Sequence, residues 1–437
     1  MVLGLVLLGT GACRTPPTSA SGAARGRPAG SKWEIGAPIV HYYQGPGANH
    51  GETTPANARK LADGGFNLVW CQTEAELDAA HAQGLRVLFY AQDIKLGDPK
   101  GTPGMLDDPV RREKLGAMIE RVKNHPAMYG YYVYDEPGAA LFPMLARLVA
   151  FIRERDPHHM AFINLFPCYA SAAALGTSGD TVTAYREHLR QFLDIVKPDA
   201  ISYDHFHFKG ADRPYDGGDY FLNLALVREA ALKGGLPFIN AVQACALGPG
   251  WRAPNGDEGR FLAYTTLAYG GQGISQFAYY NSACCPRGGV ANEDGTLTPL
   301  GEALRQINPE FVAIGGVLQP LISLGVYHLG TIPNGGVGLP ADASFTVKPP
   351  VAADQAKGIL LGYFGATDDP THVLVVNLDY TRPVTTTMVG PGPMEVFDAT
   401  GRKWRPASSG SRAGVNLMPG GGKLLRLPWP DRNVNKS

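Results

Sequence analysis

The sequence predicts an α/β protein in which a (β/α)8 TIM barrel is followed by a small antiparallel β-sandwich domain. From residue 38 onward, eight short runs rich in β-branched and aromatic residues alternate with amphipathic helix patterns. Such alternation builds a parallel sheet with helical crossovers, and eight units suit a closed barrel. After residue 320 the helix patterns stop and short alternating strands follow, as is typical of a β-sandwich.

The barrel strands are expected, in order, at 38–43 (PIVHYY), 66–72 (FNLVWCQ), 85–92 (LRVLFYAQ), 129–137 (YGYYVYDEP), 160–167 (MAFINLFP), 199–206 (DAISYDHF), 236–243 (LPFINAVQ) and 272–280 (QGISQFAYY). The helices are expected at 55–65, 74–84, 109–124, 141–157, 181–198, 219–235, 257–271 and 299–314. The first helix ends at the glycine pair Gly64 and Gly65. A doubly wound open sheet is the alternative, but no glycine-rich phosphate turn follows the first strand.

These patterns assign residues 36–320 to the barrel and 321–430 to the sandwich. The sandwich strands are expected within GILLGYFGA, THVLVVNLDYT, TTTMVG, MEVFDATGRKW and GGKLLRLPW. Each segment is short, alternates apolar and polar residues, and is bounded by turn residues, which is the pattern of antiparallel strands.

Residues 1–13, MVLGLVLLGTGAC, resemble a bacterial secretory signal with a lipoprotein cleavage box at Cys13. The segment lacks Lys and Arg, and Thr10 stands where such boxes usually have leucine. Residues 14–31 are rich in Pro, Ser, Gly and Ala and predict a disordered tether. We therefore expect an exported protein, whether periplasmic, outer-membrane-anchored or extracellular, with a lipid on Cys13 as its one membrane attachment.

The chain has 39 basic and 39 acidic residues and no long basic run, which argues against a nucleic-acid partner. It has no Cys-x-x-Cys and no histidine-rich spacing, so we expect no metal and no cofactor. We also expect a monomer. Two interpretations of the adjacent Cys284 and Cys285 stay open: a vicinal disulfide, or unpaired buried thiols.

The active site of a (β/α)8 barrel lies at the C-terminal ends of its strands, so the polar and aromatic residues there are the candidate ligands. The candidates for substrate binding are His41, Tyr43, Trp70, Gln92, Tyr134, Asn164, His205, His207, Gln243, Gln276 and Tyr279. Aromatic rings stack on the flat faces of a sugar, and amides and imidazoles bond to its hydroxyls, so the mixture predicts a carbohydrate site. The Gly/Pro-rich insertions at 96–106, 167–180, 207–218, 246–256 and 282–298 are expected to shape the cleft.

The fourth strand ends in Asp135 and Glu136, side by side before Pro137. Successive residues of a strand point to opposite faces, so both acids can face the barrel mouth only where the strand is ending, and a proline ends a ladder. Neighbouring carboxylates repel each other, which raises the pKa of one of them. A carboxyl with a raised pKa can protonate a leaving oxygen as a general acid. Asp204, at the end of the sixth strand, is the third candidate catalytic residue.

The motif YGYYVYDEPG resembles the acid/base strand of the large retaining clan of barrel glycoside hydrolases, where Asn-Glu-Pro or Asp-Glu-Pro is common. ISYDHF, GRFLAYTTLAYGGQGISQFAYY, LVVNLDYT and KLLRLP are similar to segments of secreted barrel hydrolases of this type, and the resemblance covers residues 36–430. It implies hydrolysis of O-glycosidic bonds in an oligo- or polysaccharide, with Glu136 as the general acid/base.

The sequence departs from that clan at the seventh strand, where the clan has a nucleophilic glutamate and this chain has Gln243. A neutral amide cannot be the nucleophile. Three mechanisms stay open: Asp135 assisting a substrate 2-acetamido group, Asp204 as the base of an inverting reaction, or Asp204 as the nucleophile of a retaining one. The alternative from another class is a catalytically silent carbohydrate-binding barrel at the cell surface.

Overall fold

The computed structural model of the chain describes residues 27–43, 52–210, 215–216, 218–280, 285–348 and 357–428. The signal-like segment 1–13 and the greater part of the tether lie outside the described residues. Within the described ranges, no helix combines the length and the apolar character needed to cross a membrane.

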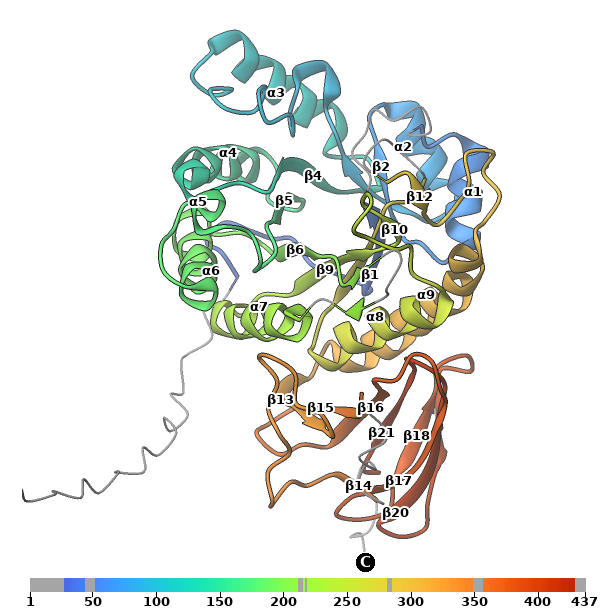
Figure 1. Ribbon diagram of the computed structural model, residues 1–437. Helices are drawn as coiled ribbons and strands as arrows, with labels where there is room; N and C mark the ends of the chain where they lie inside the picture. Colours follow the sequence, from blue (N-terminus) through green and yellow to red (C-terminus); the bar gives the residue numbers. More distant parts are fainter. Residues whose placement is uncertain are drawn as a thin grey trace, which may run out of the picture.

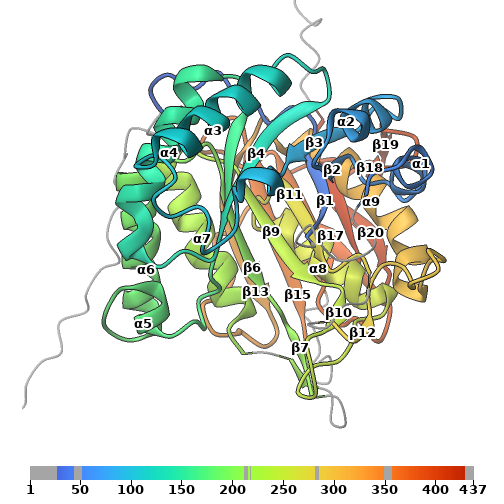
Figure 2. The ribbon, with the colours of Figure 1, turned by 90° about the horizontal axis from the view of Figure 1, so that it is seen from above.

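Eight parallel strands form the inner wall of a nearly closed barrel, as the sequence predicts (Figures 1 and 2). The strands are β1 (Ile39–Tyr43), β2 (Leu68–Cys71), β3 (Arg86–Phe89), β4 (Met128–Asp135), β5 (Met160–Leu165), β6 (Ile201–His205), β9 (Phe238–Gln243) and β11 (Gly273–Phe277). They are hydrogen-bonded in the order β1-β11-β9-β6-β5-β4-β3-β2. All of their C-terminal ends therefore meet at one rim.

The helices form the outer layer: α1 (Pro55–Asp63), α2 (Glu74–His81), α3 (Pro109–Val122), α4 (Phe142–Arg155), α5 (Ala172–Leu175), α6 (Thr181–Gln191), α7 (Tyr220–Gly234), α8 (Gly256–Ala268) and α9 (Pro299–Leu318). Their starts follow capping rules. Thr73 with Glu76, and Asn255 with Glu258, form capping boxes at α2 and α8. The short α5 lies inside the 167–180 insertion, where the sequence predicts only loop.

Side chains close the barrel between β1 and β2. One main-chain bond joins these strands, from the Asn67 N–H to the Val40 carbonyl at 2.9 Å. The Asn67 side chain adds two more, accepting from the Val40 N–H and donating to the Pro38 carbonyl. The Arg86 guanidinium donates to Asn67 Oδ1 at 2.9 Å and to the Ile35 carbonyl at 2.7 Å. An amide and a guanidinium thus take the place of a ladder at this joint.

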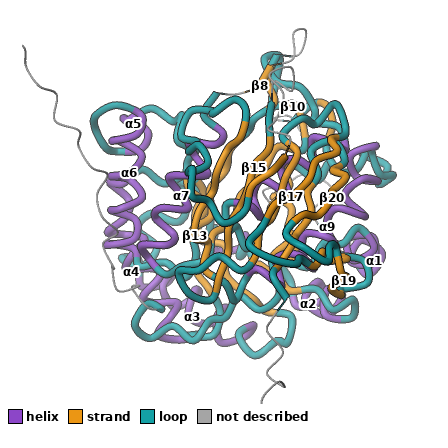
Figure 3. Tube along the Cα trace, turned by 90° about the horizontal axis from the view of Figure 1, so that it is seen from below, coloured by secondary structure: helices purple, strands orange, loops and turns teal. Residues whose placement is uncertain are grey.

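Two antiparallel sheets follow the barrel and pack on the side of α8 (Figures 1 and 3). The larger has the order β13 (Ile322–Leu329), β15 (Ile359–Gly365), β16 (His372–Asn377), β21 (Gly422–Arg426), β18 (Glu395–Asp398) and β19 (Lys403–Pro406). The smaller pairs β14 (Thr346–Lys348), β17 (Val384–Val389) and β20 (Arg412–Leu417). Phe345, Val373 and Met388 are among the residues buried between the sheets. Gly362 of β15 lies so close to the Ala268 carbonyl that a Cβ there would collide with it.

The cysteine interpretations are corrected by a disulfide between Cys245 and Cys285, which are 40 residues apart. Cys245 begins the two-residue strand β10 (Cys245–Ala246), which pairs antiparallel with β12 (Arg287–Gly288). The loops after the neighbouring strands β9 and β11 therefore meet, and Cys285 bonds across them rather than to Cys284, which lies outside the described residues. The spacing of cysteines in sequence does not reveal which loops meet in space.

We expect the double variant Cys245→Ser/Cys285→Ser to unfold with a free energy about 2–4 kcal/mol lower than that of the wild type, because the cross-link restricts the unfolded chain. Urea unfolding with and without dithiothreitol measures the difference. The reductant should lower the stability of the wild type and leave the serine variant unchanged. A wild type that is insensitive to full reduction would contradict the assignment.

Candidate active site

A β-bulge in β4 turns Asp135 toward the barrel mouth. The ladder between β4 and β5 shifts register between Tyr132 and Tyr134. Tyr132 faces the barrel interior, where its ring centroid lies 4.9 Å from that of Trp70. The extra residue in the bulge reverses the alternation of side chains after it, so Asp135 pairs with the inward-facing Asn164. Without the bulge, Asp135 would point outward to the helices.

Glu136 reaches the same site through an unusual backbone conformation. Its φ is 47°, in the left-handed region that residues with a Cβ rarely adopt and that costs roughly 1–2 kcal/mol. Its N–H donates to the Asn164 carbonyl at 2.8 Å, which holds the turn in place, and Pro137 follows. The bulge and the turn together let two successive carboxylates face one site. Strained backbone of this kind is often found where a side chain must be aimed for function.

Two carboxyl groups accept hydrogen bonds from the amide of Asn164, and a third lies near them. Its Nδ2 donates to Asp135 Oδ1 at 3.2 Å and to Asp204 Oδ2 at 3.3 Å. Its Oδ1 accepts from Ser202 Oγ at 2.8 Å, which fixes the orientation of the amide. The side chain of Asp204 interacts with the Glu136 carboxyl and lowers its pKa, so the two carboxyl groups lie near each other. Neighbouring carboxyl groups titrate together, because the negative charge of one disfavours ionisation of the other.

Burial is the main cause that raises the pKa of Glu136, to about 7, and the negative charge of Asp135 raises it further. The interaction with the Asp204 side chain lowers the pKa of Glu136 and so acts in the opposite direction. The pKa of Asp204 is raised far above its usual range, first by burial and then by the charges of Glu136 and Asp135. The cluster can therefore hold and release a proton near neutral pH, which is the requirement for general acid–base chemistry.

His41 and Trp70, both predicted ligands, lie in the packed interior of the barrel. His41 Nδ1 lies 2.9 Å from Ser275 Oγ, and burial lowers the pKa of His41 to about 3. Trp70 Nε1 donates to the Tyr42 carbonyl, and its ring contacts those of His41 and Phe162. Phe162 precedes the inward-facing Asn164 by two residues on β5, so these rings form the layer beneath the carboxyl cluster.

The expected substrate contacts of His205 and His207 are not supported, because both side chains lie in the layer of the outer helices. His205 is 1% exposed, and its Nδ1 lies 3.0 Å from Asn223 Oδ1 on α7. The His207 ring lies 4.7 Å from that of Tyr220 on α7. Since Asp204 faces inward, the next residue on the strand must face outward. Burial accordingly lowers the pKa of His205 to about 4.

Gln243 is a structural brace, which corrects its expected place among the ligands. It is fully buried, its Oε1 accepts from the Phe208 N–H, and its Nε2 donates to the carbonyls of Phe208, Cys245 and Arg252. The amide thus fastens the loops after β6 and β9, and its N–H groups are used within the protein.

The remaining predicted ligands lie in different surroundings. Gln276 follows Ser275, whose Oγ meets the inward-facing His41, so the Gln276 side chain faces the helices and is 1% exposed, which does not support a substrate contact. Tyr279 is 4% exposed, and its ring contacts those of Tyr42 and Phe66. Tyr134 is 6% exposed, whereas Gln92 is exposed to solvent. The side chain of Tyr43 lies outside the described residues.

The sequence analysis missed three residues: Tyr169, which lies within electrostatic reach of the carboxyl cluster, and Lys209 and Trp251, which lie next to it in turn. Tyr169 is 37% exposed, and its pKa is raised by burial and by the charges of Asp204 and Glu136. Each residue comes from one of the Gly/Pro-rich insertions expected to shape the cleft. Aromatic and basic residues within those insertions were the available signal.

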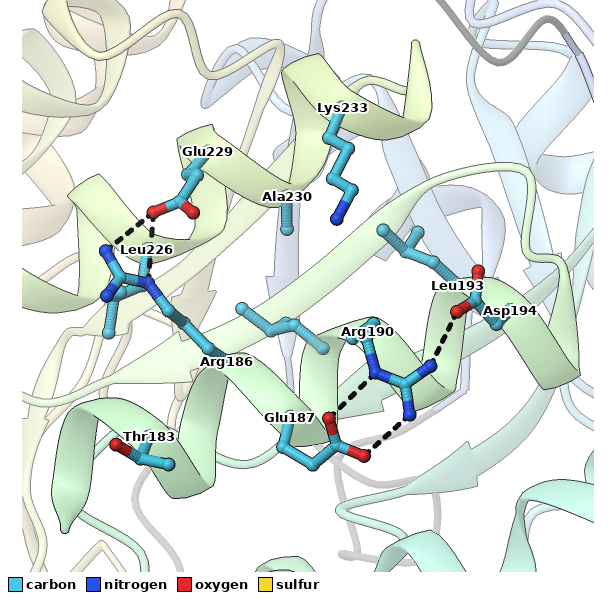
Figure 4. A pocket seen from close by; sticks show the side chains of 11 residues that line it. Thr183, Arg186, Glu187, Arg190, Leu193, Asp194, Leu226, Glu229, Ala230 and Lys233 are labelled. Atoms are coloured by element: carbon cyan, nitrogen blue, oxygen red, sulfur yellow. Dashed lines mark hydrogen bonds and ion pairs between the residues drawn. The ribbon is translucent and has the colours of Figure 1, made fainter. Parts of the chain in front are cut away.

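A surface groove of about 360 Å³ lies elsewhere, on the outer wall between α6 and α7 (Figure 4). Arg186 pairs there with Glu229 at 2.9 Å, and Arg190 pairs with Glu187 at 2.7 Å. The groove is on the helical side of the barrel and far from the strand ends in the fold. We therefore assign it no part in the candidate site.

In the part of the chain that the structure describes, no group of three or more His, Cys, Asp or Glu side chains is arranged to hold a metal ion. Carboxyl groups such as those clustered at the rim can take part in proton transfer and in nucleophilic attack.

No model of a known protein family matches the sequence, and a comparison with curated proteins finds no significant relative. Solved structures do share the fold. A β-galactosidase from Bacillus circulans sp. alkalophilus superposes with a TM-score of 0.56 at 10% identity, covering 90% of this chain and 99% of that one. A glycoside hydrolase gives 0.53 at 12% identity, covering 89% and 92%. A glycoside hydrolase family 5 protein from Bacteroides vulgatus gives 0.51 at 12% identity, covering 89% of each chain.

Identities of 10–12% establish the likeness of the fold alone. This chain therefore has the barrel fold of glycoside hydrolases with antiparallel β-sheets at its C-terminal end, as the resemblance of the Asp-Glu-Pro strand implies. Its chemistry has to be argued from its own residues.

Proposed function

We propose that the protein is a glycoside hydrolase that cleaves O-glycosidic bonds of an oligo- or polysaccharide, with Glu136 as the general acid/base. The observation that carries the proposal is the position of this carboxyl at the rim of the barrel, with its pKa raised to about 7. A carboxyl that is protonated near neutral pH can give its proton to a leaving glycosidic oxygen. The fold shared with known glycosidases supports the substrate class.

We further propose Asp204 as the second carboxylate. The two side chains lie near enough to interact, which favours a short separation over the about 6.5–9.5 Å between the carboxyls of an inverting enzyme. A retaining reaction needs only about 5–5.5 Å and uses the second carboxylate as the nucleophile. In the proposed sequence, Glu136 protonates the leaving oxygen while Asp204 attacks the anomeric carbon. Glu136 then takes a proton from the water that releases the sugar.

Asp135 supports the other retaining route, in which it orients a substrate 2-acetamido group that attacks in place of the protein. Asn164 holds the carboxylates of Asp135 and Asp204 on one amide, so either lies within reach of the same sugar. The substrates distinguish the two routes. Activity on hexosides that lack the acetamido group would remove the substrate-assisted one.

The runner-up function is a catalytically silent carbohydrate-binding barrel. It is favoured by Gln243, a neutral amide that stands at the end of the seventh barrel strand and is bound to main-chain groups. Hydrolysis of aryl glycosides and polysaccharides, each with and without 2-acetamido groups, tests the two functions against each other. Glycan binding without turnover by the wild type would support the binder and overturn the proposed hydrolysis.

Two observations support action outside the cytoplasm. The first is the signal-like segment 1–13, and the second is the disulfide between Cys245 and Cys285, since structural disulfides persist in oxidising compartments. We propose an exported protein on this basis. Cell fractionation with a Cys13→Ala control tests both export and attachment by a lipid.

The pH dependence of kcat should follow the protonation of Glu136. A general acid works only while protonated, so activity should fall as the pH rises through about 7, where this carboxyl loses its proton. We expect a tenfold loss for each unit of pH beyond that point, measured as initial rates on one substrate with the fold checked by circular dichroism. A flat profile between pH 6 and 9 would contradict the assignment.

A further inference from the structure

The ammonium group of Lys209 lies between two aromatic rings at the barrel rim. Its Nζ is 5.0 Å from the ring centroid of Tyr169 and 4.9 Å from that of Trp251. Lys209 ends the short strand β7 (Phe208–Lys209) and forms an isolated antiparallel bridge with Trp251. The Gly210 N–H donates to the Gly250 carbonyl at 2.9 Å beside it. The main chain therefore keeps the lysine and the tryptophan next to each other.

This group of residues borders the carboxyl cluster. Phe206 follows Asp204 by two residues, and its ring contacts those of Trp251 at 6.2 Å and Phe277 at 5.1 Å. Phe277 ends β11, so the contacts lie at the C-terminal rim of the barrel. Tyr169 lies on the other side of Lys209 and within electrostatic reach of the carboxyls.

The charge of Lys209 is the feature that a neutral sugar does not explain. The side chain is half-buried, and among the described residues it meets ring faces and no carboxylate. Aromatic faces attract a cation but accept none of its three N–H bonds as a carboxylate would. The ionised carboxylates of the nearby acidic cluster would repel an anionic ligand. The Lys209 ammonium, between the rings of Tyr169 and Trp251, would offset this repulsion for an anion bound beside it.

We propose that Tyr169, Lys209 and Trp251 form a subsite for an acidic sugar unit, a uronic acid whose carboxylate pairs with the Lys209 ammonium while the rings stack on its faces. The inference takes from the proposed function that the ligand is a carbohydrate, and it adds that one sugar unit is negatively charged. It is independent of whether the bond is cleaved, because binding can be measured without turnover.

The test is calorimetric binding to the full-length Glu136→Gln protein at low salt. The probes are two acidic oligosaccharides, trigalacturonate and a hyaluronan tetrasaccharide, with galactotriose and chitotetraose as neutral counterparts. We expect at least one acidic probe to bind about tenfold or more tighter than its counterpart, a difference that added salt reduces. Adding Lys209→Met should weaken binding of that acidic probe about tenfold and leave the neutral probes within twofold. Lys209→Arg should retain the preference, and Lys233→Met on the outer wall is the matched control.

Equal affinity for acidic and neutral probes, or no binding of either acidic probe, would overturn the subsite. So would an equal loss for both classes in Lys209→Met. The proposed function fails separately. If the acidic probes bind more tightly and the wild type cleaves no glycan, the subsite is supported and the proposed hydrolysis is overturned. If the wild type cleaves neutral glycans and Lys209→Met changes no affinity, the hydrolysis is supported and the subsite is overturned.

Discussion

Glu136→Gln is expected to lower kcat about 10²–10⁴-fold, because glutamine keeps the shape of the side chain and has no proton to give. The loss should depend on the leaving group. A sugar or alkyl leaving group needs protonation, whereas dinitrophenolate departs without it, so the deficit should shrink on dinitrophenyl glycosides. The basic limb of the pH profile, set by the raised pKa of Glu136, should also disappear.

Kinetics on a graded series of leaving groups measures this effect. Glu154→Gln is the matched control, since Glu154 is exposed on α4 and removes the same charge without touching the rim. An equal deficit for good and poor leaving groups would argue that Glu136 positions the substrate and does not donate the proton. Full activity of Glu136→Gln would remove it from the chemistry altogether.

Asp204→Asn is expected to reduce kcat by about 10³-fold or more, because the amide cannot attack the anomeric carbon. Azide should restore turnover in Asp204→Gly, because removal of the side chain leaves space for a small anion, and the product should be a glycosyl azide of inverted configuration. Product analysis by proton NMR measures the configuration. Full activity with an unchanged pH profile would overturn the role of Asp204.

Asp204→Asn should also have a higher free energy of unfolding than the wild type at neutral pH. Burial and neighbouring charges raise the folded-state pKa of Asp204, so folding binds a proton that the unfolded chain releases above its ordinary pKa of about 3.9. In the wild type, this proton uptake lowers the free energy of unfolding. The loss is absent below about pH 3.9 and grows as the pH rises toward the folded-state pKa. Thermal unfolding at pH 4 and pH 8 should therefore show a gain for Asp204→Asn only at the higher pH. Loss of activity together with gained stability separates a reacting group from a structural one.

The barrel could be predicted from the sequence because its signal is repeated. Each strand–helix unit carries its own periodicity, and the helix starts follow local rules such as the Thr73 capping box, so small errors at the ends do not change the architecture. The predicted helix at 181–198 shows the limit. It ends as α6 at Gln191, and a π-helical turn at Phe192–Val196 completes it.

The site was predictable only in part, because side-chain direction depends on single residues of register. The bulge near Tyr132 turns Asp135 inward, and regular alternation turns His205 outward; the sequence carries no clear mark of either. Contacts between loops could not be predicted from the sequence either. The partner of Cys285 and the rings around Lys209 come from segments that approach only after the barrel has formed.

The joint between β1 and β2 differs in kind from the other seven in the ring of eight strands. Those seven are main-chain ladders. Their hydrogen bonds do not depend on the side chains, so most point mutations leave them in place. The eighth has a main-chain bond from Asn67 to Val40 and depends otherwise on side chains: those of Asn67 and Arg86 at the N-terminal ends of the strands, and that of Trp70 nearer the mouth. Substitution of single residues can therefore change the closure of the barrel at this joint, first at the base, where Asn67 and Arg86 lie.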